Sequence, residues 1–154
     1  MPQDLTIIKP FLALKENEIL TVVIYGEARG EVWEGMIAVL NVIRNRTNYS
    51  QFQDSTLMMF GLYSSVILKK YQFSCFLQAD PNYPKLISIA DKFDDRLHSD
   101  PLIDRIHHMC VIKDNILDNT DGATHYFTKQ IQPPSWSSSM TKTAEIGNHL
   151  FFRS

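Results

Sequence analysis

The sequence predicts an α+β fold that is mainly helical, with a small antiparallel β element near the C-terminus. Two features indicate this fold. Residues 16–28 and 32–47 carry apolar side chains at helical spacing, and further periodic runs follow as far as residue 111. After residue 118 the pattern changes to short aromatic or β-branched segments between turn residues. At this length the chain is expected to form one domain, residues 1–154.

The first two helices are predicted to meet at a tight corner. In the helix over residues 16–28, Glu27 continues an apolar stripe at i+3 and i+4 spacing. The second helix, over residues 32–47, has a stripe of its own. Gly30 lies between the two helices and is expected to take a positive φ, which would end the first helix and let the second begin at once. The first stripe consists of Leu20, Val23 and Ile24, and the second of Trp33, Met36, Ile37, Leu40 and Ile43.

Later helices are predicted from their start signals. Asp54 begins a capping sequence for a short helix that runs to Phe60. Pro84 opens a periodic run that reaches Phe93, and Pro101 opens another that reaches Val111. Four or five helices are therefore expected, and the aromatic segment at residues 71–76 between them is expected to be a loop.

Two short strands are predicted after the turn cluster at residues 118–122. They span residues 123–127 and 150–152, and a loop rich in proline and serine at residues 133–139 separates them. No internal repeat or linker divides the chain. This C-terminal part supplies the β element of the predicted fold.

Charge and cysteine content exclude several classes of protein. The formal charge is −2, with no long run of either sign, so a nucleic-acid or membrane-surface partner is not expected. No apolar run resembles a signal peptide or a membrane span, which favours synthesis in the cytoplasm without membrane insertion. Cys75 and Cys110 are expected to be partly buried free thiols.

Glu27 is the residue whose position most needs an explanation. A carboxyl group at the edge of an apolar stripe is partly desolvated, and desolvation raises its pKa because it disfavours the charged form. A carboxyl group with a pKa near neutrality can act as a general acid and protonate a leaving oxygen. The alternative is a helix-terminal glutamate that pairs with Arg29 or Arg44 or reaches solvent.

Several short blocks occur in order along almost the whole chain, from about residue 18 to residue 153. Together they resemble the SleB-like cell-wall hydrolases, the family of the spore cortex-lytic enzymes. In two places the chain differs from the family pattern: the stretch at residues 57–70 is longer, and Phe76 stands where a tryptophan is expected. The blocks are Tyr25–Glu31, Trp33–Gly35, Ala38–Arg46, Gln72–Cys75, Gly122–Tyr126, Pro134–Trp136 and Ile146–Arg153.

The resemblance implies a lysozyme-like fold and cleavage of the β-1,4 bond between N-acetylmuramic acid and N-acetylglucosamine in peptidoglycan. It places Glu27 at the position of the catalytic acid. Glycosidases usually need two carboxylates, but one suffices if the muramic acid C6 hydroxyl is the nucleophile. The expected reaction is therefore lytic transglycosylation, which leaves a 1,6-anhydro ring.

A sugar-binding groove is expected around Glu27, because sugar rings stack on aromatic side chains and their hydroxyls need fixed donors and acceptors. For Phe73 and Trp136, packing in the core is an equally open interpretation. The candidate substrate-binding residues are Tyr71, Gln72, Phe73, Ser74, Thr124, His125, Tyr126 and Trp136.

Three other functions stay open. The first is a muramidase that uses water, with Glu31, Glu34 or Asp121 as its second carboxylate. The second is a zinc amidase or peptidase, although the histidines show no H-E-x-x-H or similar spacing. The third is a wall-binding module or virion protein without catalysis. The histidines are His98, His107, His108, His125 and His149.

The expected partners are the glycan strands of peptidoglycan, with no cofactor and no metal. The absence of a signal sequence and of wall-binding repeats favours a bacteriophage endolysin. Such an enzyme would act as a monomer and reach the cell wall through a holin-type pore after its synthesis in the cytoplasm.

Overall fold

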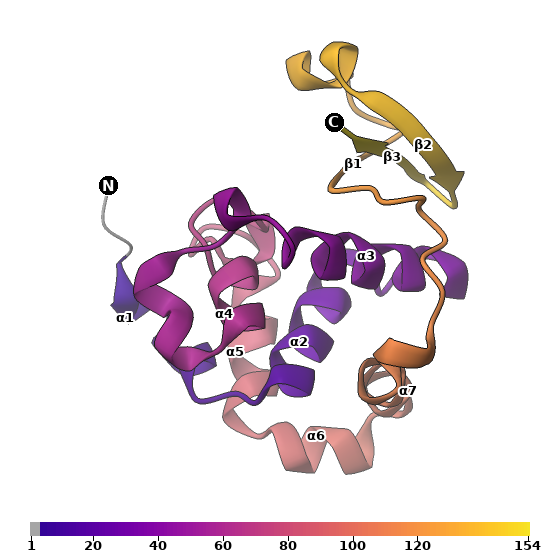
Figure 1. The fold of residues 1–154 in the computed structure, drawn as a ribbon. Helices are drawn as coiled ribbons and strands as arrows, with labels where there is room; N and C mark the ends of the chain where they lie inside the picture. Colours follow the sequence, from indigo (N-terminus) through magenta and orange to yellow (C-terminus); the bar gives the residue numbers. More distant parts are fainter. Residues whose placement is uncertain (1–3) are drawn as a thin grey trace.

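Helices form the body of the molecule, and a small sheet lies along one side of it, in a computed structural model that describes residues 4–154 (Figure 1). Residues 1–3 of the expected domain lie outside the described residues. The described part of the chain contains seven α-helices: α1 (Leu5–Leu12), α2 (Glu16–Ala28), α3 (Trp33–Arg46), α4 (Leu62–Ile67), α5 (Tyr83–Asp91), α6 (Phe93–Ser99) and α7 (Pro101–Val111). Short 3₁₀ turns, which include η1 (Ser50–Phe52), η2 (Ser55–Phe60) and η3 (Ser74–Phe76), connect some of them.

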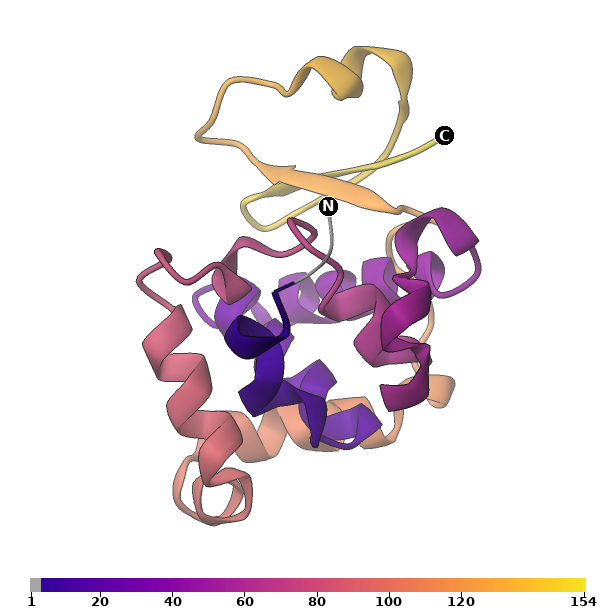
Figure 2. The same cartoon turned by 90° about the vertical axis from the view of Figure 1, so that its left-hand side faces the viewer.

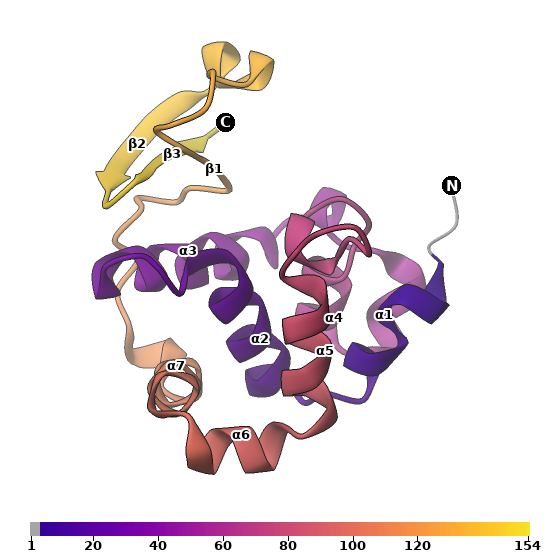
Figure 3. The same ribbon diagram turned by 180° about the vertical axis from the view of Figure 1, so that it is seen from behind.

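Helix α2 runs through the middle of the helical body, with α3, α4, α5 and α7 packed around it (Figure 3). A helix that is apolar on all sides is stable only when other elements enclose it, and α2 fits that description. Its five central apolar side chains are fully buried: Ile19, Leu20, Val22, Val23 and Ile24. The core of the protein is therefore built around the helix that carries Glu27.

The sheet has the strand order β1-β3-β2, and all its pairs are antiparallel. Its strands are β1 (His125–Thr128), β2 (Thr141–Ile146) and β3 (His149–Arg153). In Figure 2 the sheet lies above the helices. Phe151 of β3 is fully buried and packs in a second, smaller core with Ala38 and Val42 of α3. This contact seats the sheet on α3.

Most of the predicted elements are confirmed. Helix α2 has the predicted bounds, and α3 and α7 differ from theirs by at most one residue at an end. The Asp54 cap is confirmed, since its carboxylate accepts from the Thr56 N–H at 2.9 Å, although the turn that follows is 3₁₀ and not α. The thiols of Cys75 and Cys110 are free and buried.

The predicted number of helices and strands was too low. Helix α1 contains Pro10, and α4 and α6 have only six and seven residues, so none of them shows the longer periodic pattern on which the prediction rested. The run from Pro84 breaks before Phe93 into α5 and α6. Strand β2 was missed because its sequence, Thr141–Ile146, is mostly polar and half-exposed.

The expected positive φ at Gly30 was wrong. Among the described residues, the glycines with positive φ are Gly61, Gly122 and Gly147. The corner closes by an ordinary turn instead, in which the Glu31 N–H donates to the Ala28 carbonyl at 2.9 Å. No helix in residues 4–154 is both long enough and apolar enough to span a bilayer.

Candidate active site

Glu27 lies one residue before the end of α2, where the segment after α4 packs closely on the helix. A Cβ on the neighbouring Gly26 would approach Cys75 Sγ and Leu86 Cδ1 to 3.0 Å each, so only glycine fits there without a shift. The absent side chain lets η3 and α5 cover the end of α2. Glu27 is partly buried as a result.

The Glu27 carboxyl has the properties of a general acid. Its burial, with a smaller contribution from the negative charge of Asp80, raises its pKa to about 7, while the positive charge of Arg46 acts in the opposite direction. No other described residue makes a hydrogen bond to this carboxyl group. Near neutral pH, Glu27 can therefore hold its proton, and none of the described residues accepts it.

Arg46 ends α3 and is almost completely buried, with 7% of its surface exposed. Its Nε donates to the Thr124 carbonyl at 2.7 Å, and its guanidinium carbon lies 5.3 Å from the ring centre of Phe52 and 5.2 Å from that of Phe73. Its Nη1 is buried and has no hydrogen-bond partner among residues 4–154. Sequence analysis did not identify Arg46 as a site residue.

Tyr126 of β1 brings the sheet to the same site. Burial, followed by the charge of Glu27, raises the pKa of its phenol well above the ordinary value, so the hydroxyl stays protonated. Its ring lies 4.9 Å from that of His149 and 5.7 Å from that of Phe151. A neutral hydroxyl donor from the sheet thus lies near the acid from α2.

Asp80 is a second carboxylate that the structure brings toward Glu27. One of its oxygens accepts from the Asn82 N–H at 2.8 Å. The side chain of Asn82 in turn accepts from Arg29 Nη2 at 2.7 Å, which ties this turn to the end of α2. Asp80 lies in a loop with no periodic pattern, so the sequence gives no sign of its position.

Glu31 has a different role from Glu27, because it holds the β2–β3 turn against the corner between α2 and α3. Its Oε1 accepts from the Asn148 N–H at 3.0 Å and lies 3.3 Å from Nδ1 of the buried His149. The pKa of His149 is below its ordinary value, chiefly because of burial, so the contact with Glu31 involves a neutral ring. A Cβ on Gly147 would lie only 2.9 Å from Glu31 Oε1.

The predicted substrate-binding residues fall into an exposed and a buried group. Tyr71 is 72% exposed and Ser74 is also exposed, while Gln72 is half-buried. Phe73 is buried in the core beneath Arg46, and Thr124 is buried as well. Direct sugar contact by Phe73 or Thr124 would therefore need a different local arrangement. The Phe73 ring lies against the Arg46 guanidinium group, and the Thr124 backbone carbonyl accepts from Arg46 Nε.

His125 and Trp136 belong to an aromatic cluster on the sheet. The His125 ring lies 5.6 Å from Phe52 and 5.0 Å from Trp136, and its Nδ1 is 2.9 Å from the Thr124 hydroxyl. Trp136 also contacts Phe152 at 5.6 Å between ring centres. Both residues are half-buried, so part of each stays accessible to solvent.

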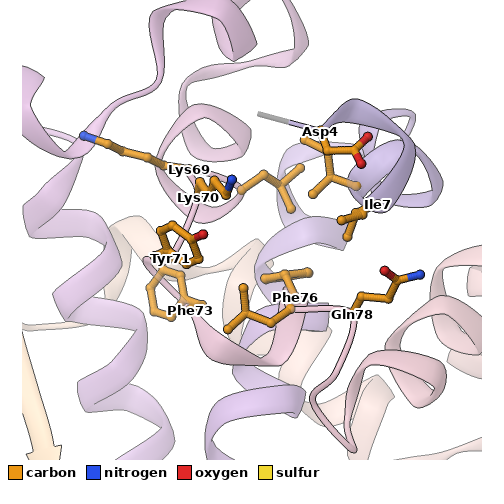
Figure 4. Close-up of a pocket in the computed structure, with 11 residues that line it drawn as sticks. Asp4, Ile7, Lys69, Lys70, Tyr71, Phe73, Phe76 and Gln78 are labelled. Carbon is orange, nitrogen blue, oxygen red and sulfur yellow. The ribbon is translucent and has the colours of Figure 1, made fainter. Parts of the chain in front are cut away.

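Tyr71 is the exposed aromatic residue with an unusual backbone. Its φ is +67°, a conformation that non-glycine residues rarely adopt and that often marks functional loops. The Lys70 amine lies 5.0 Å from its ring centre. Figure 4 shows the pocket beside it, between α1 and the loop after α4. Asp4, Ile7, Ile8, Leu68, Lys69, Lys70, Tyr71, Phe73, Phe76, Leu77 and Gln78 line this pocket, so it is separate from the Glu27 carboxyl.

None of the remaining candidate carboxylates or histidines is among the groups whose charge shifts the Glu27 pKa. Glu34 and Asp121 are exposed. Within residues 4–154, no three histidine, cysteine or acidic side chains are grouped in a way that could hold a metal ion.

Comparison with known proteins gives a consistent set of relatives. A family model described as Cell Wall Hydrolase matches residues 30–152, a range that begins three residues after Glu27. The chain is 28% identical over 134 residues to a spore cortex-lytic enzyme of Halalkalibacterium halodurans, and 26% identical over 138 residues to one of Oceanobacillus iheyensis. Each alignment covers 87% of this chain but only 33% and 40% of the respective relatives.

Two solved structures share the fold. One is the catalytic domain of the germination-specific lytic transglycosylase SleB from Bacillus anthracis, with a TM-score of 0.63 at 22% identity over 90% of this chain and 93% of that domain. The other is the catalytic domain of Bacillus cereus SleB, with a TM-score of 0.54 at 23% identity over 90% and 91%. The mainly helical fold with a small antiparallel sheet is thereby confirmed.

Proposed function

Because the chain belongs to the cell wall hydrolase family, we propose that it cleaves the β-1,4 bond between N-acetylmuramic acid and N-acetylglucosamine by lytic transglycosylation. The observation that carries this proposal is the Glu27 carboxyl, which is partly buried at the end of α2 and has a pKa of about 7. Such a group can donate a proton near neutral pH and accept it back in the next step.

In the first step Glu27 gives its proton to the glycosidic oxygen. The bond from this oxygen to C1 of the muramic acid breaks, and N-acetylglucosamine leaves as the free alcohol. Positive charge develops on C1, where the substrate's own N-acetyl group can share it. No second protein carboxylate is needed for this step.

In the second step the Glu27 carboxylate acts as a base. It takes the proton of the muramic acid C6 hydroxyl while that oxygen attacks C1, which closes the 1,6-anhydro ring. The proton lost in the first step is thereby restored, and no water is consumed. The high pKa suits both steps, because neither the acid nor the base form of Glu27 is strongly favoured near neutrality.

The substrate would lie across the end of α2, between the loop that carries Tyr71 and the sheet. The exposed ring of Tyr71 and the half-buried rings of His125 and Trp136 offer aromatic surface on which sugars can stack. Ser74, Gln72 and the Tyr126 hydroxyl offer hydrogen bonds. These contacts, together with a monomeric state and release through a holin-type pore, stay predictions.

A hydrolytic muramidase is the second candidate function, and Asp80 is the observation that favours it. Its negative charge raises the pKa of Glu27, so among the described carboxylates it is the one that acts on the proposed acid. In a hydrolytic mechanism it would activate a water molecule. Glu31 is less suited to that role because its Oε1 already accepts from the Asn148 N–H and contacts His149.

Mass spectrometry of the products tests the proposal. Purified peptidoglycan is digested with the wild type, with Glu27→Gln and with Glu34→Gln, which removes an exposed carboxylate of α3 as a control. We expect muropeptides with 1,6-anhydro ends from the wild type and the control, and no new glycan ends from Glu27→Gln. Products heavier by one water would favour the muramidase, and new free amines in place of glycan ends would contradict both.

A further inference from the structure

Arg46 is a charged side chain that the fold buries without fully pairing it. One of its nitrogens donates to the Thr124 carbonyl, and two aromatic faces, Phe52 and Phe73, enclose the guanidinium group. Nη1 is buried, and no described residue makes a hydrogen bond to it. A buried charge left partly unpaired normally costs several kcal/mol. The fold therefore retains this cation at a cost to its stability.

The segment that covers Arg46 also covers the end of α2. Phe73 lies against the guanidinium group, and two residues later Cys75 packs on Gly26, the neighbour of Glu27. The same short segment thus covers Arg46 at the end of α3 and the end of α2 that carries Glu27. These two helices also pack on each other. Tyr126 from the sheet is the third side chain of this group.

Within the described part of the chain, the charge on Arg46 meets a negative charge in only one state of Glu27. Tyr126 and Glu27 are the groups whose charge acts on Arg46, and the Tyr126 phenol stays neutral. When Glu27 is protonated, the guanidinium group has no anionic neighbour among these residues. When Glu27 has lost its proton, the carboxylate supplies the missing negative charge.

We propose that Arg46 is a positioning residue whose fixed, buried charge stabilises the carboxylate that Glu27 becomes after it has protonated the glycosidic oxygen. The inference rests on the function proposed above. An interaction that is stronger after proton transfer than before it lowers the barrier, because it favours the transition state over the bound substrate. The hydrogen bond to Thr124 and the two rings hold the charge in place before the reaction begins.

Other groups around Glu27 act on its proton as well. Asp80, from the loop before α5, repels the carboxylate and so opposes Arg46. The Cys75 thiol from η3 stays protonated, because its burial raises its pKa well above the ordinary range. His125 from β1 is held neutral by its burial and by the charge of Arg46. Arg46 and Asp80 are thus the two opposed charges, and they should move the Glu27 pKa in opposite directions when removed.

Titration of the Glu27 carboxyl by NMR, with ¹³C-labelled glutamate and Glu27→Gln to assign the signal, tests the proposal without any substrate. Arg46→Met should raise the pKa of Glu27, because the positive charge that favours the carboxylate is removed. Arg46→Lys, which keeps the charge, should leave it closer to the wild-type value. Asp80→Asn should lower it.

Met is the first choice at position 46 because an apolar side chain of similar length often replaces a buried charge without loss of stability. Arg46→Gln is the second neutral variant, and thermal unfolding shows which of the two is folded. An unchanged or lower Glu27 pKa in the folded neutral variant would overturn the proposal. A shift in the same direction in Asp80→Asn would also overturn it, because it would indicate general loosening of the site.

The rate of peptidoglycan cleavage as a function of pH gives the second measurement. Glu27 must start protonated, so activity is lost as pH rises through its pKa, and Arg46→Met should move this alkaline limb to higher pH. We expect its kcat to fall by about 10-fold or more, with a smaller change in KM. If no variant cleaves peptidoglycan, the proposed function fails while the NMR titration still reports whether Arg46 acts on Glu27.

Discussion

Glu27 and Glu31 lie four residues apart in the same short block, yet the fold uses them in opposite ways. The Glu27 carboxyl receives no hydrogen bond from another described residue, and its pKa rises to about 7. The Glu31 carboxyl accepts from the Asn148 N–H and touches His149. A carboxylate with fixed protein donors suits a structural role, whereas one left unpaired and partly buried is available for proton transfer.

The corner between α2 and α3 produces this difference. Glu27 is still on α2, where its neighbour Gly26 packs on the segment that follows α4, while Glu31 follows the turn and contacts the β2–β3 connection. The Glu27 carboxyl is thus desolvated by burial, while the Glu31 carboxyl accepts a backbone hydrogen bond from the β2–β3 turn. We expect changes at Glu27 to affect the reaction and changes at Glu31 to affect the attachment of the sheet.

The largest expected effect is on activity. Glu27→Gln removes the proton donor at nearly constant shape and should lower the rate of peptidoglycan cleavage by about 10²- to 10⁴-fold. Glu31→Gln should keep activity within about 10-fold at a temperature where it is folded. Release of soluble muropeptides measures both. A larger loss in Glu31→Gln than in Glu27→Gln would reverse the assignment of the two roles.

The next effect is on stability and depends on pH. The pKa of Glu27 is about 7 in the folded protein against an ordinary 4.5, so folding favours its protonated form. The protonated Glu27 thereby contributes to the free energy of unfolding. This contribution is fully present below pH 4.5 and is lost as pH rises through about 7. At about 1.4 kcal/mol per unit it amounts to about 3 kcal/mol.

Glu27→Gln stays neutral and does not lose this contribution. Relative to the wild type, its free energy of unfolding should therefore increase by about 3 kcal/mol between a pH of about 4 and a pH of about 8. Urea unfolding at both values measures the difference. Parallel pH profiles for the two proteins would mean that Glu27 has an ordinary pKa.

Gly147 tests the structural side of the comparison. Its φ is +56°, and an added Cβ would lie 2.9 Å from Glu31 Oε1. Gly147→Ala should therefore destabilise the protein by about 1–3 kcal/mol. Gly30→Ala is the matched control, since Gly30 has no positive φ and an added Cβ would meet nothing within 4 Å. Equal melting temperatures for the two variants would show that the Glu31 contact is unimportant.

The smallest expected effect comes from Glu31 itself. Glu31→Gln keeps an oxygen that can accept from the Asn148 N–H but loses the charge, so the free energy of unfolding should fall by about 0.5–1.5 kcal/mol. The exposed Glu34→Gln should change it by less than about 0.5 kcal/mol. Chemical denaturation compares the two, and a greater loss from Glu34→Gln would contradict the role given to Glu31.

The family could be predicted from the ordered sequence blocks. Helix α2 and the burial of Glu27 could be predicted because the apolar pattern of α2 is long and regular. Arg46 could have been predicted by the same reasoning, since it continues a stripe through Val39, Val42 and Ile43 at helical spacing. A positively charged residue at the C-terminal end of a helix is common, because it interacts favourably with the helix dipole. Arg46 therefore did not stand out as a site residue.

Other parts of the structure leave no such pattern. Asp80 reaches the site through a loop whose path depends on the Arg29–Asn82 contact between residues far apart in sequence. The clamp between Glu31 and the β2–β3 turn likewise joins residues 117 positions apart. Strand β2 is defined by its pairing with β3 and not by apolar alternation. Long-range contacts of this kind become visible only in the folded chain.

The most direct test of the account is the titration of Glu27 in the wild-type protein. A ¹³C NMR titration of its side-chain carboxyl, assigned with Glu27→Gln, should show a midpoint of about 7, because burial and Asp80 together outweigh Arg46. A midpoint near the ordinary value of 4.5 would mean that Glu27 is ionised at neutral pH and holds no proton to give, which would contradict its role as the acid.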